Sequence, residues 1–228
     1  MGEPVSQVLD NPAYAALGGP HARFAQVRGR ARRYLPEVAP FLAVPFAPSA
    51  QDWRDAADLI APGAYVGLLQ SAAYLPDGWR TAKTFDAVQM IGERVSGRGC
   101  ADAVELGAAD VPAMLDLVAE TEPGPFLART VELGEYLGIR EQGKLVAMAG
   151  ERLRVDGWTE ISAVCTRASH RGRGLASRLI AALIAGIELR SERVFLHVLT
   201  DNTAAIRLYE ELGFQVRRSM TIAVVTPG

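Results

Sequence analysis

Residues 171–176 read Arg171-Gly172-Arg173-Gly174-Leu175-Ala176, a glycine-rich loop between two regular segments. The residues before it, at 158–166, are rich in β-branched and aromatic types and predict a buried strand. After it, apolar residues recur at helical spacing from Leu175 to Ile187. Two glycines allow a tight turn, and the first turn of a helix offers unpaired N–H groups. The stretch therefore predicts a strand, an anion-binding loop with two arginines beside it, and a helix.

Two other phosphate loops do not fit these residues. The nucleotide-hydrolase loop, in which Gly and four residues precede Gly-Lys and Ser or Thr, occurs nowhere in the chain. The dinucleotide fingerprint requires a third glycine where Ser177 stands, and the acidic residue Glu192 precedes the next strand instead of ending one. On the loop alone, a glycine-rich turn without a ligand stays an alternative.

Further elements follow the loop. A strand is predicted at 193–198, then the capping cluster Asp201-Asn202-Thr203 and an amphipathic helix that Gly213 ends. A last pair of strands is expected between residues 214 and 225.

With these elements the chain resembles the GNAT superfamily of N-acetyltransferases over about residues 103–228. The coenzyme A loop of that family, Gln/Arg-x-x-Gly-x-Gly/Ala, fits residues 171–176 at every fixed position. A later family motif, Asn-x-x-Ala-x-x-Leu-Tyr-x-x-x-Gly-Phe, is matched by Asn202, Ala205, Leu208, Tyr209, Gly213 and Phe214. Two motifs in order are a more specific signal than either alone. Within the superfamily, the likeness is greatest to glycine N-acyltransferase-like proteins, with one departure at Ala168, where many members have proline.

The resemblance implies the α/β GNAT fold, a mixed and mostly antiparallel central sheet flanked by helices. An acetyltransferase domain at 103–228 is expected. Its earlier elements are predicted as a strand at 104–106, a helix starting at 108–112, and strands at 135–140 and 144–152 joined by a turn at 141–143.

The N-terminal α/β region, residues 1–98, has no motif that we can name. Its pattern predicts a basic helix at 21–34, a strand at 41–44, a helix at 50–60, and strands at 65–69 and 85–92. That order is similar to the second half of the GNAT core, which gives the hypothesis of a degenerate GNAT half packed beside the catalytic domain. An ordinary α/β extension is the alternative. The arginines at 28–33 could meet an acidic partner or form a solvated helix face.

The resemblance assigns acetyl-CoA as co-substrate to one continuous site. The loop would bind the pyrophosphate mainly through backbone N–H groups, and the end of the preceding strand would bond the pantetheine amides as an added strand does. Asn202 would bond the pantetheine arm, a role that is compatible with a helix N-cap. The expected binding residues are Val164, Cys165, Thr166, Arg171, Gly172, Arg173, Gly174, Leu175, Ala176, Ser177 and Asn202.

Two residues are expected to handle protons. Glu160 lies eleven residues before Arg171, the spacing at which related histone-type acetyltransferases have their catalytic glutamate. Burial on an apolar strand would raise the pKa of Glu160 and suit a general base, acting directly or through water. A glutamate paired with an arginine is the alternative. Tyr209 would donate a proton to the coenzyme A thiolate, and a core tyrosine is its alternative.

Simple alternation along the strand would place two sets of side chains on opposite faces. One set is Glu160, Ser162, Val164 and Thr166, and the other is Ile161, Ala163 and Cys165.

Composition excludes several other classes. The three histidines have no ligand-like spacing, so no metal is expected, and the two cysteines predict neither a disulfide framework nor a nucleophile. The net charge of -2 argues against general nucleic-acid binding. No apolar run is long enough to cross a membrane and no secretion signal is seen, so a cytoplasmic location is expected.

The sequence therefore predicts an acetyl-CoA-dependent N-acetyltransferase that transfers an acetyl or other acyl group directly to a primary amine. The acceptor would be a small molecule or a peptide, and residues 121–134 are expected to shape its pocket. A catalytically silent acyl-CoA-binding protein with a regulatory or scaffold role is the alternative. Acceptor identity, acyl chain length and oligomeric state are left open.

Overall fold

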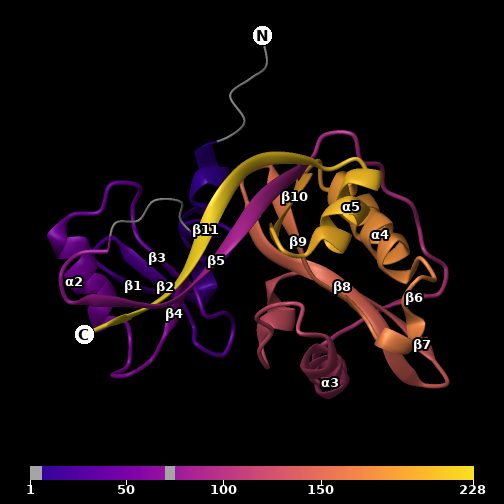
Figure 1. Cartoon of the computed structure of the whole chain (residues 1–228), viewed down its shortest axis with the longest axis horizontal. Coiled ribbons are helices and arrows are strands. Elements are labelled where there is room, and N and C mark those ends of the chain that lie inside the picture. Colours follow the sequence, from indigo (N-terminus) through magenta and orange to yellow (C-terminus); the bar gives the residue numbers. More distant parts are fainter. Residues whose placement is uncertain (1–6, 70–74) are drawn as a thin grey trace, which may run out of the picture.

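The structure is a computed structural model that describes residues 7–69 and 75–228. Two sheets organise the chain: a three-stranded sheet of order β1-β2-β3, and an eight-stranded sheet of order β4-β11-β5-β10-β9-β8-β7-β6. Figure 1 shows two lobes, one holding the small sheet and one holding most of the large sheet, with the long strands β5 and β11 running from one to the other.

The large sheet contains β4 (Val66–Leu68), β5 (Trp79–Gly92), β6 (Ala103–Glu105), β7 (Tyr136–Glu141), β8 (Lys144–Val155), β9 (Trp158–Thr166), β10 (Arg193–Leu199) and β11 (Gln215–Pro227). The small sheet contains β1 (Ala25–Arg28), β2 (Ala31–Tyr34) and β3 (Leu42–Ala43). Among the described strands of the large sheet, β9 and β10 pair in parallel and the other neighbours are antiparallel. The predicted mixed, mostly antiparallel α/β fold is therefore confirmed.

The α-helices are α1 (Pro12–Leu17), α2 (Ala50–Asp58), α3 (Val111–Thr121), α4 (Leu175–Leu189) and α5 (Thr203–Glu211). Short 3-10 turns are η1 (Gln7–Asp10), η2 (Ala22–Phe24), η3 (Ala108–Asp110), η4 (Thr130–Leu133) and η5 (Ala168–His170).

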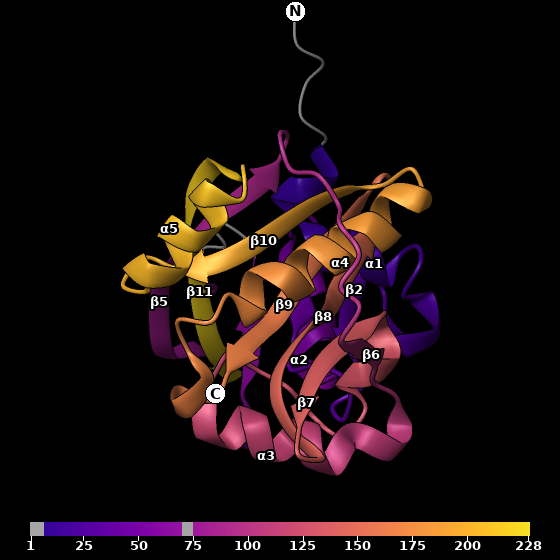
Figure 2. The ribbon, with the colours of Figure 1, turned by 90° about the vertical axis from the view of Figure 1, so that its right-hand side faces the viewer.

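Helices cover both faces of the large sheet (Figure 2). On one face α4 buries six apolar side chains in a cluster with β7 to β10, and α5 joins that cluster. Each such residue contributes about 1.5–3 kcal/mol relative to an exposed position, which fixes α4 firmly beneath its glycine loop. Elsewhere α3 packs on β8 and β9, and α1 packs with the small sheet against β8, β9 and β10.

Strand β5 belongs to the N-terminal region in sequence and to the large sheet in space. It lies between β10 and β11, so that Val88 is paired with Val198 on one side and with Ser219 on the other. Residues 79–92 therefore form part of the central sheet instead of packing beside it.

Two expectations for other segments are wrong. The predicted basic helix at 21–34 is the η2 turn and the hairpin of β1 and β2, which turns at Gly29 with a φ of 52°. Two of its arginines, Arg28 and Arg30, pair with acidic residues of α2, as in the Arg30–Asp52 contact at 2.5 Å. These ion pairs form with the segment in an extended conformation. The hypothesis of a degenerate GNAT half loses that helix but stays a prediction, because β4 and β5 of the N-terminal region alternate with β11 and β10 in the large sheet. The expected last strand pair is the single strand β11, whose partner is β5.

No helix within the described ranges is long and apolar enough to cross a bilayer.

Candidate functional site

A cavity of about 400 Å³ lies where the end of β9, the glycine loop and α5 meet. Its lining residues are Thr166, His170, Arg171, Gly172, Gly174, Leu175, Ala176, Ser177, Ala204, Ala205 and Leu208. The structure thus brings seven of the predicted binding residues to one place. Four others, Val164, Cys165, Arg173 and Asn202, are not part of this lining.

Gly172 and Gly174 have backbone conformations that require glycine. Their φ angles are 74° and 70°, in the left-handed region that side chains rarely adopt. A Cβ atom at either position would meet no atom within 4 Å, so the space beside both glycines is open. Gly174 is also the N-cap residue of α4, whose first-turn N–H groups lie next to that space.

Basic side chains surround the loop, and two of them, Arg173 and His170, share one carboxylate. Arg173 pairs with Glu141 at 2.5 Å, and Nε2 of His170 lies 3.3 Å from the same carboxylate. Arg173 holds the pKa of the Glu141 carboxyl below its usual range. Arg171 makes a long contact of 3.4 Å to the carbonyl of Thr166. Arg173 therefore points to the β7–β8 turn.

The β9–β10 ladder opens towards this cavity. Its last pair of residues is Glu160 and Phe195, and the strands continue beyond that pair without further pairing to each other. Ala163 has a φ of 52°, and β9 places two residues, 163 and 164, against one residue of β8. Such a bulge leaves part of the ladder unpaired, as bulges near active sites often do.

The bulge corrects the predicted alternation. Ile161 and Val164 share the apolar cluster of α4, whereas Ala163 and Cys165 pack with α3. Simple alternation therefore holds up to the bulge and is wrong beyond it. Burial raises the pKa of the Cys165 thiol to about 11, which keeps it protonated near neutrality. At the end of the strand, Oγ1 of Thr166 is buried and has no hydrogen-bond partner in the described chain.

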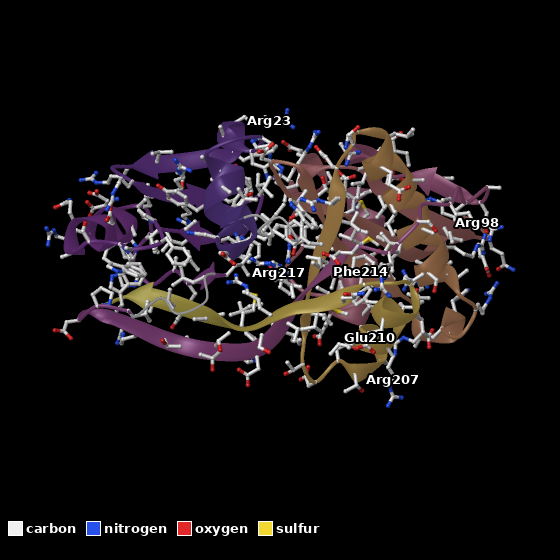
Figure 3. The ribbon with its side chains drawn as sticks, turned by 90° about the horizontal axis from the view of Figure 1, so that it is seen from above. Arg23, Arg98, Arg207, Glu210, Phe214 and Arg217 are labelled. Carbon is white, nitrogen blue, oxygen red and sulfur yellow. The ribbon has the colours of Figure 1, made fainter. Side chains whose placement is uncertain are left out.

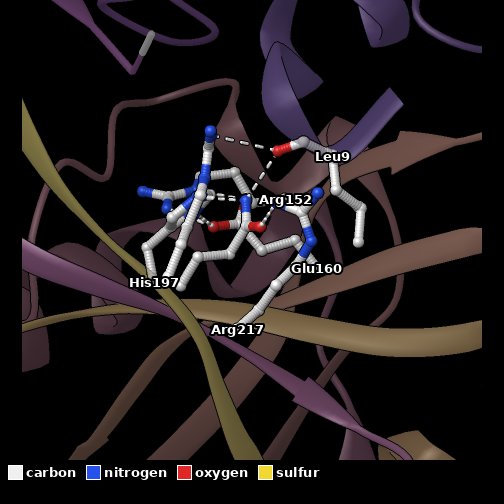
Figure 4. Close-up of polar contacts among 7 residues, drawn as sticks. Leu9, Arg152, Glu160, His197 and Arg217 are labelled. Atoms are coloured by element: carbon white, nitrogen blue, oxygen red, sulfur yellow. Dashed lines mark hydrogen bonds and ion pairs between the residues drawn. The ribbon is translucent and has the colours of Figure 1, made fainter. Parts of the chain in front are cut away.

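Glu160 lies in a buried ion pair with Arg152. Arg152 donates from Nη2 to Oε1 at 2.5 Å and from Nε to Oε2 at 2.9 Å, and His197 donates from Nδ1 to Oε1 at 2.6 Å (Figure 4). Burial opposes the charged form, but Arg152 and His197 outweigh it and lower the pKa of Glu160 to about 2. The predicted raised pKa is therefore wrong, because the sequence argument counted burial and not these partners.

Sequence reasoning missed the residues around Glu160. Arg152 could have been found, because the Asp156-Gly157 turn predicts a hairpin that places the 152 region opposite Glu160. No local signal indicates His197, which is on the parallel neighbour β10.

Tyr209 is mostly buried on α5, with its ring edge-to-face against Phe214 at 5.8 Å. Burial raises the pKa of its hydroxyl to about 12, and that hydroxyl forms no hydrogen bond within the described residues. It does not line the cavity, but its neighbour Leu208 does. Oδ1 of Asn202 accepts a hydrogen bond from the N–H of Ala205 at 3.2 Å, which confirms the predicted N-cap. In Figure 3, Arg207 and Glu210 point outward from the same helix.

Known proteins share these features. Residues 136–222 match the model of the family described as FR47-like protein. The N-alpha-acetyltransferase RimI of Mycobacterium tuberculosis is 37% identical over 101 residues, which cover 41% of this chain and 63% of that protein.

Solved structures extend the match to the whole chain. A crystal structure described as a putative acetyltransferase from the GNAT family, from Novosphingobium aromaticivorans, is 37% identical with a TM-score of 0.89. The match covers 98% of this chain and 100% of that one. A GCN5-related N-acetyltransferase from Kribbella flavida has the same fold at 17% identity, with a TM-score of 0.63 over 97% and 96% of the two chains. The chain belongs to the GNAT family of N-acetyltransferases, whose members use acetyl-CoA as co-substrate.

Proposed function

We propose that the protein transfers an acetyl or other acyl group from acyl-CoA directly to a primary amine of a small molecule or peptide. The observation that carries the proposal is the cavity at the glycine loop, with open space beside Gly172 and Gly174 and the unpartnered Oγ1 of Thr166 close by. The open space beside the two glycines would let a ligand approach the backbone. The unpartnered hydroxyl of Thr166 could then donate a hydrogen bond to that ligand or accept one from it.

In this proposal the pyrophosphate lies on the N-terminus of α4. The N–H groups of Leu175, Ala176 and Ser177 belong to the first turn and have no partner inside the helix, and the helix dipole favours an anion there. Arg171 adds positive charge, and Arg173 would exchange its contact with Glu141 for the phosphates. Val164, Cys165 and Thr166 provide the strand end that opens beside β10, where the pantetheine arm would form strand-like hydrogen bonds. Asn202 keeps the N-terminus of α5 ordered at the same opening.

The co-substrate supplies an acetyl thioester, and the amine attacks its carbonyl carbon so that a C–N bond forms while the C–S bond breaks. We assign Tyr209 to protonate the departing thiolate, and the proton that the nitrogen loses on becoming the amide returns to the tyrosine oxygen through water. Its raised pKa keeps the hydroxyl protonated at neutral pH, and its lack of a protein partner leaves the proton available. Leu208, which precedes it, places α5 at the cavity wall.

Glu160 has a different role in this proposal from that of a general base. Its carboxylate accepts from Arg152 and His197, and a pKa of about 2 makes it a weak acceptor for an ammonium proton. We assign it to holding β8, β9 and β10 together where the β9–β10 ladder ends. The amine would then lose its proton to water before attack.

Release of free thiol from acetyl-CoA in the presence of a panel of amines and peptide N-termini tests the proposal, with mass spectrometry to identify products. RimI carries N-alpha-acetyltransferase in its name, which makes peptide N-termini the first acceptors to include. Binding itself should raise the free energy of unfolding by about 2.7 kcal/mol when acetyl-CoA is present at one hundred times its dissociation constant. Binding without thiol release for any amine would contradict the proposal and favour a silent acyl-CoA-binding protein.

A further inference from the structure

A line of buried polar side chains crosses five strands of the large sheet. It consists of Arg152 on β8, Glu160 on β9, His197 on β10, Gln89 on β5 and Arg217 on β11. Beyond Arg217 it reaches the 3-10 turn η1, at the start of the described chain. Figure 4 shows the convergence of Arg152, Glu160 and His197, with the carbonyl of Leu9 approaching from η1.

Gln89 connects η1 to His197, and both the nitrogen and the oxygen of its side-chain amide are hydrogen-bonded. Its Nε2 donates to the carbonyl of Leu9 at 2.8 Å and to Nε2 of His197 at 3.1 Å, and its Oε1 accepts from Nη1 of Arg217 at 2.9 Å. His197 consequently accepts at Nε2 and donates at Nδ1 to Glu160. Gln89 and Glu160 are 0% exposed, so water cannot replace a lost partner.

A bulge in β11 anchors the other end of the line. Arg217 is the extra residue between Val216 and Arg218 in the pairing with β5. Both arginines consequently reach the carboxylate of Asp10, Arg217 at 2.7 Å and Arg218 at 3.2 Å. In Figure 3, Arg217 lies between the two lobes. The turn η1 is thus held against the sheet by two ion pairs.

The line is placed where backbone pairing stops. Glu160 and Phe195 are the last backbone pair of β9 and β10, and His197 lies two residues further along β10. Its bond to Glu160 therefore links the last paired residue of β9 to β10 beyond the last backbone pair, and Gln89 holds the imidazole from the opposite side. On the other side of the ion pair, the ring of Phe41 lies 5.2 Å from the Arg152 guanidinium and covers it.

We propose that Gln89 and His197 are positioning residues for acyl transfer, which set the separation of the open ends of β9 and β10, with η1 as their anchor. This inference rests on the proposed function, because those open ends are where the pantetheine arm is placed. A strand end that shifts would misalign the backbone of Val164 to Thr166 with the arm, so coenzyme affinity would fall even though no side chain of the line touches the coenzyme.

The test compares Gln89→Met with Ile91→Val, a buried position on the same strand outside the line. Met has a similar length without hydrogen bonds to the line, whereas Val removes one methylene group from the core. Calorimetry with coenzyme A, KM and kcat for acetyl-CoA, and urea unfolding are measured for both. We expect Gln89→Met to weaken coenzyme A binding and raise KM by about tenfold, and Ile91→Val to leave both within about twofold.

A second pair of variants keeps the test decisive if Gln89→Met does not fold. In His197→Gln the amide can still donate to Glu160 and accept from Gln89, so affinity should stay close to that of the native protein; in His197→Leu it should fall. Native affinity in Gln89→Met or His197→Leu, or equal losses in Gln89→Met and Ile91→Val, would overturn the inference. Coenzyme A binding without turnover of any amine would instead contradict the proposed function. The coenzyme A affinities of the variants would still test the positioning role of Gln89 and His197.

Discussion

Both oxygens of the Glu160 carboxylate are held by Arg152, whose Nη2 and Nε atoms lie 2.5 and 2.9 Å away. Neither side chain has appreciable contact with solvent, since the exposed fractions of their side chains are 0% and 11%. We therefore expect the Glu160 carboxylate to stabilise the sheet and not to act as a general base.

Glu160→Gln should therefore destabilise the protein. It leaves the Arg152 charge buried without its counter-ion, and breaking a buried pair costs about 3–5 kcal/mol. Urea unfolding should show a loss of this size, and the double variant Arg152→Met with Glu160→Met should recover much of it. Native stability combined with a large loss of kcat in Glu160→Gln would instead identify Glu160 as the base.

Acid should destabilise the protein in two steps. Burial lowers the pKa of His21 from 6.5 to about 4, so its contribution is complete above pH 6.5 and is lost as the pH falls towards 4. The pKa of Glu160 is lowered from 4.5 to about 2, so its contribution is complete above pH 4.5 and is lost as the pH falls through 2. Unfolding free energies between pH 7 and 4 measure the first step. His21→Gln should flatten it, and an unchanged slope would contradict the assignment to His21.

Gly174→Ala and Gly157→Ala form a matched pair. Both glycines have a φ of 70° and open space where a Cβ would be, so each variant should lose about 1–2 kcal/mol of stability through the strained backbone. Gly157 is in the turn between β8 and β9, outside the cavity lining, whereas Gly174 lines it. Calorimetry should show weaker coenzyme A binding for Gly174→Ala alone. Equal affinities in the two variants would remove the loop from the proposed site.

Glu141→Gln should strengthen coenzyme A binding. It frees Arg173 and His170 from their shared carboxylate, and because that ion pair is exposed to solvent the gain in affinity should be small. The gain should shrink in high salt. Glu37→Gln is the control, since it removes the same charge from an exposed pair with Arg129. A similar gain in both variants would show a general charge effect instead.

A fragment of residues 99–228 should not fold alone. It lacks β5, which separates β10 from β11 and pairs with both. Co-expression with residues 1–98 should restore a folded complex, because the break falls between β5 and β6. Circular dichroism and amide exchange would show the difference, and a folded, coenzyme-binding fragment would refute this dependence on β5.

Local patterns predicted the elements nearest the cavity. Strand 158–166, the helix that starts at Leu175 and the Asn202 cap are all decided by residues close in sequence, and each is confirmed. The tight turn at Gly172 and Gly174 could also be predicted, because both have positive φ angles, which residues other than glycine rarely adopt.

Long-range partners decided the rest. Residues 21–34 were predicted as a helix, yet pairing within the small sheet and ion pairs to α2 hold most of them extended. The charge state of Glu160 depends on Arg152 and His197 from other strands, and burial alone predicts the opposite shift. No periodicity marks Ala163 as a bulge, because the extra residue is defined by its pairing with β8.

The place of β5 has a consequence for how the protein is made. Its two neighbours, β10 and β11, are synthesised more than 100 residues later. Both edges of β5 therefore stay unpaired until the last part of the chain leaves the ribosome. Contacts this distant in sequence slow folding and lengthen the time during which such edges can pair with other chains. We therefore expect the nascent protein to depend on chaperones more than its small size suggests.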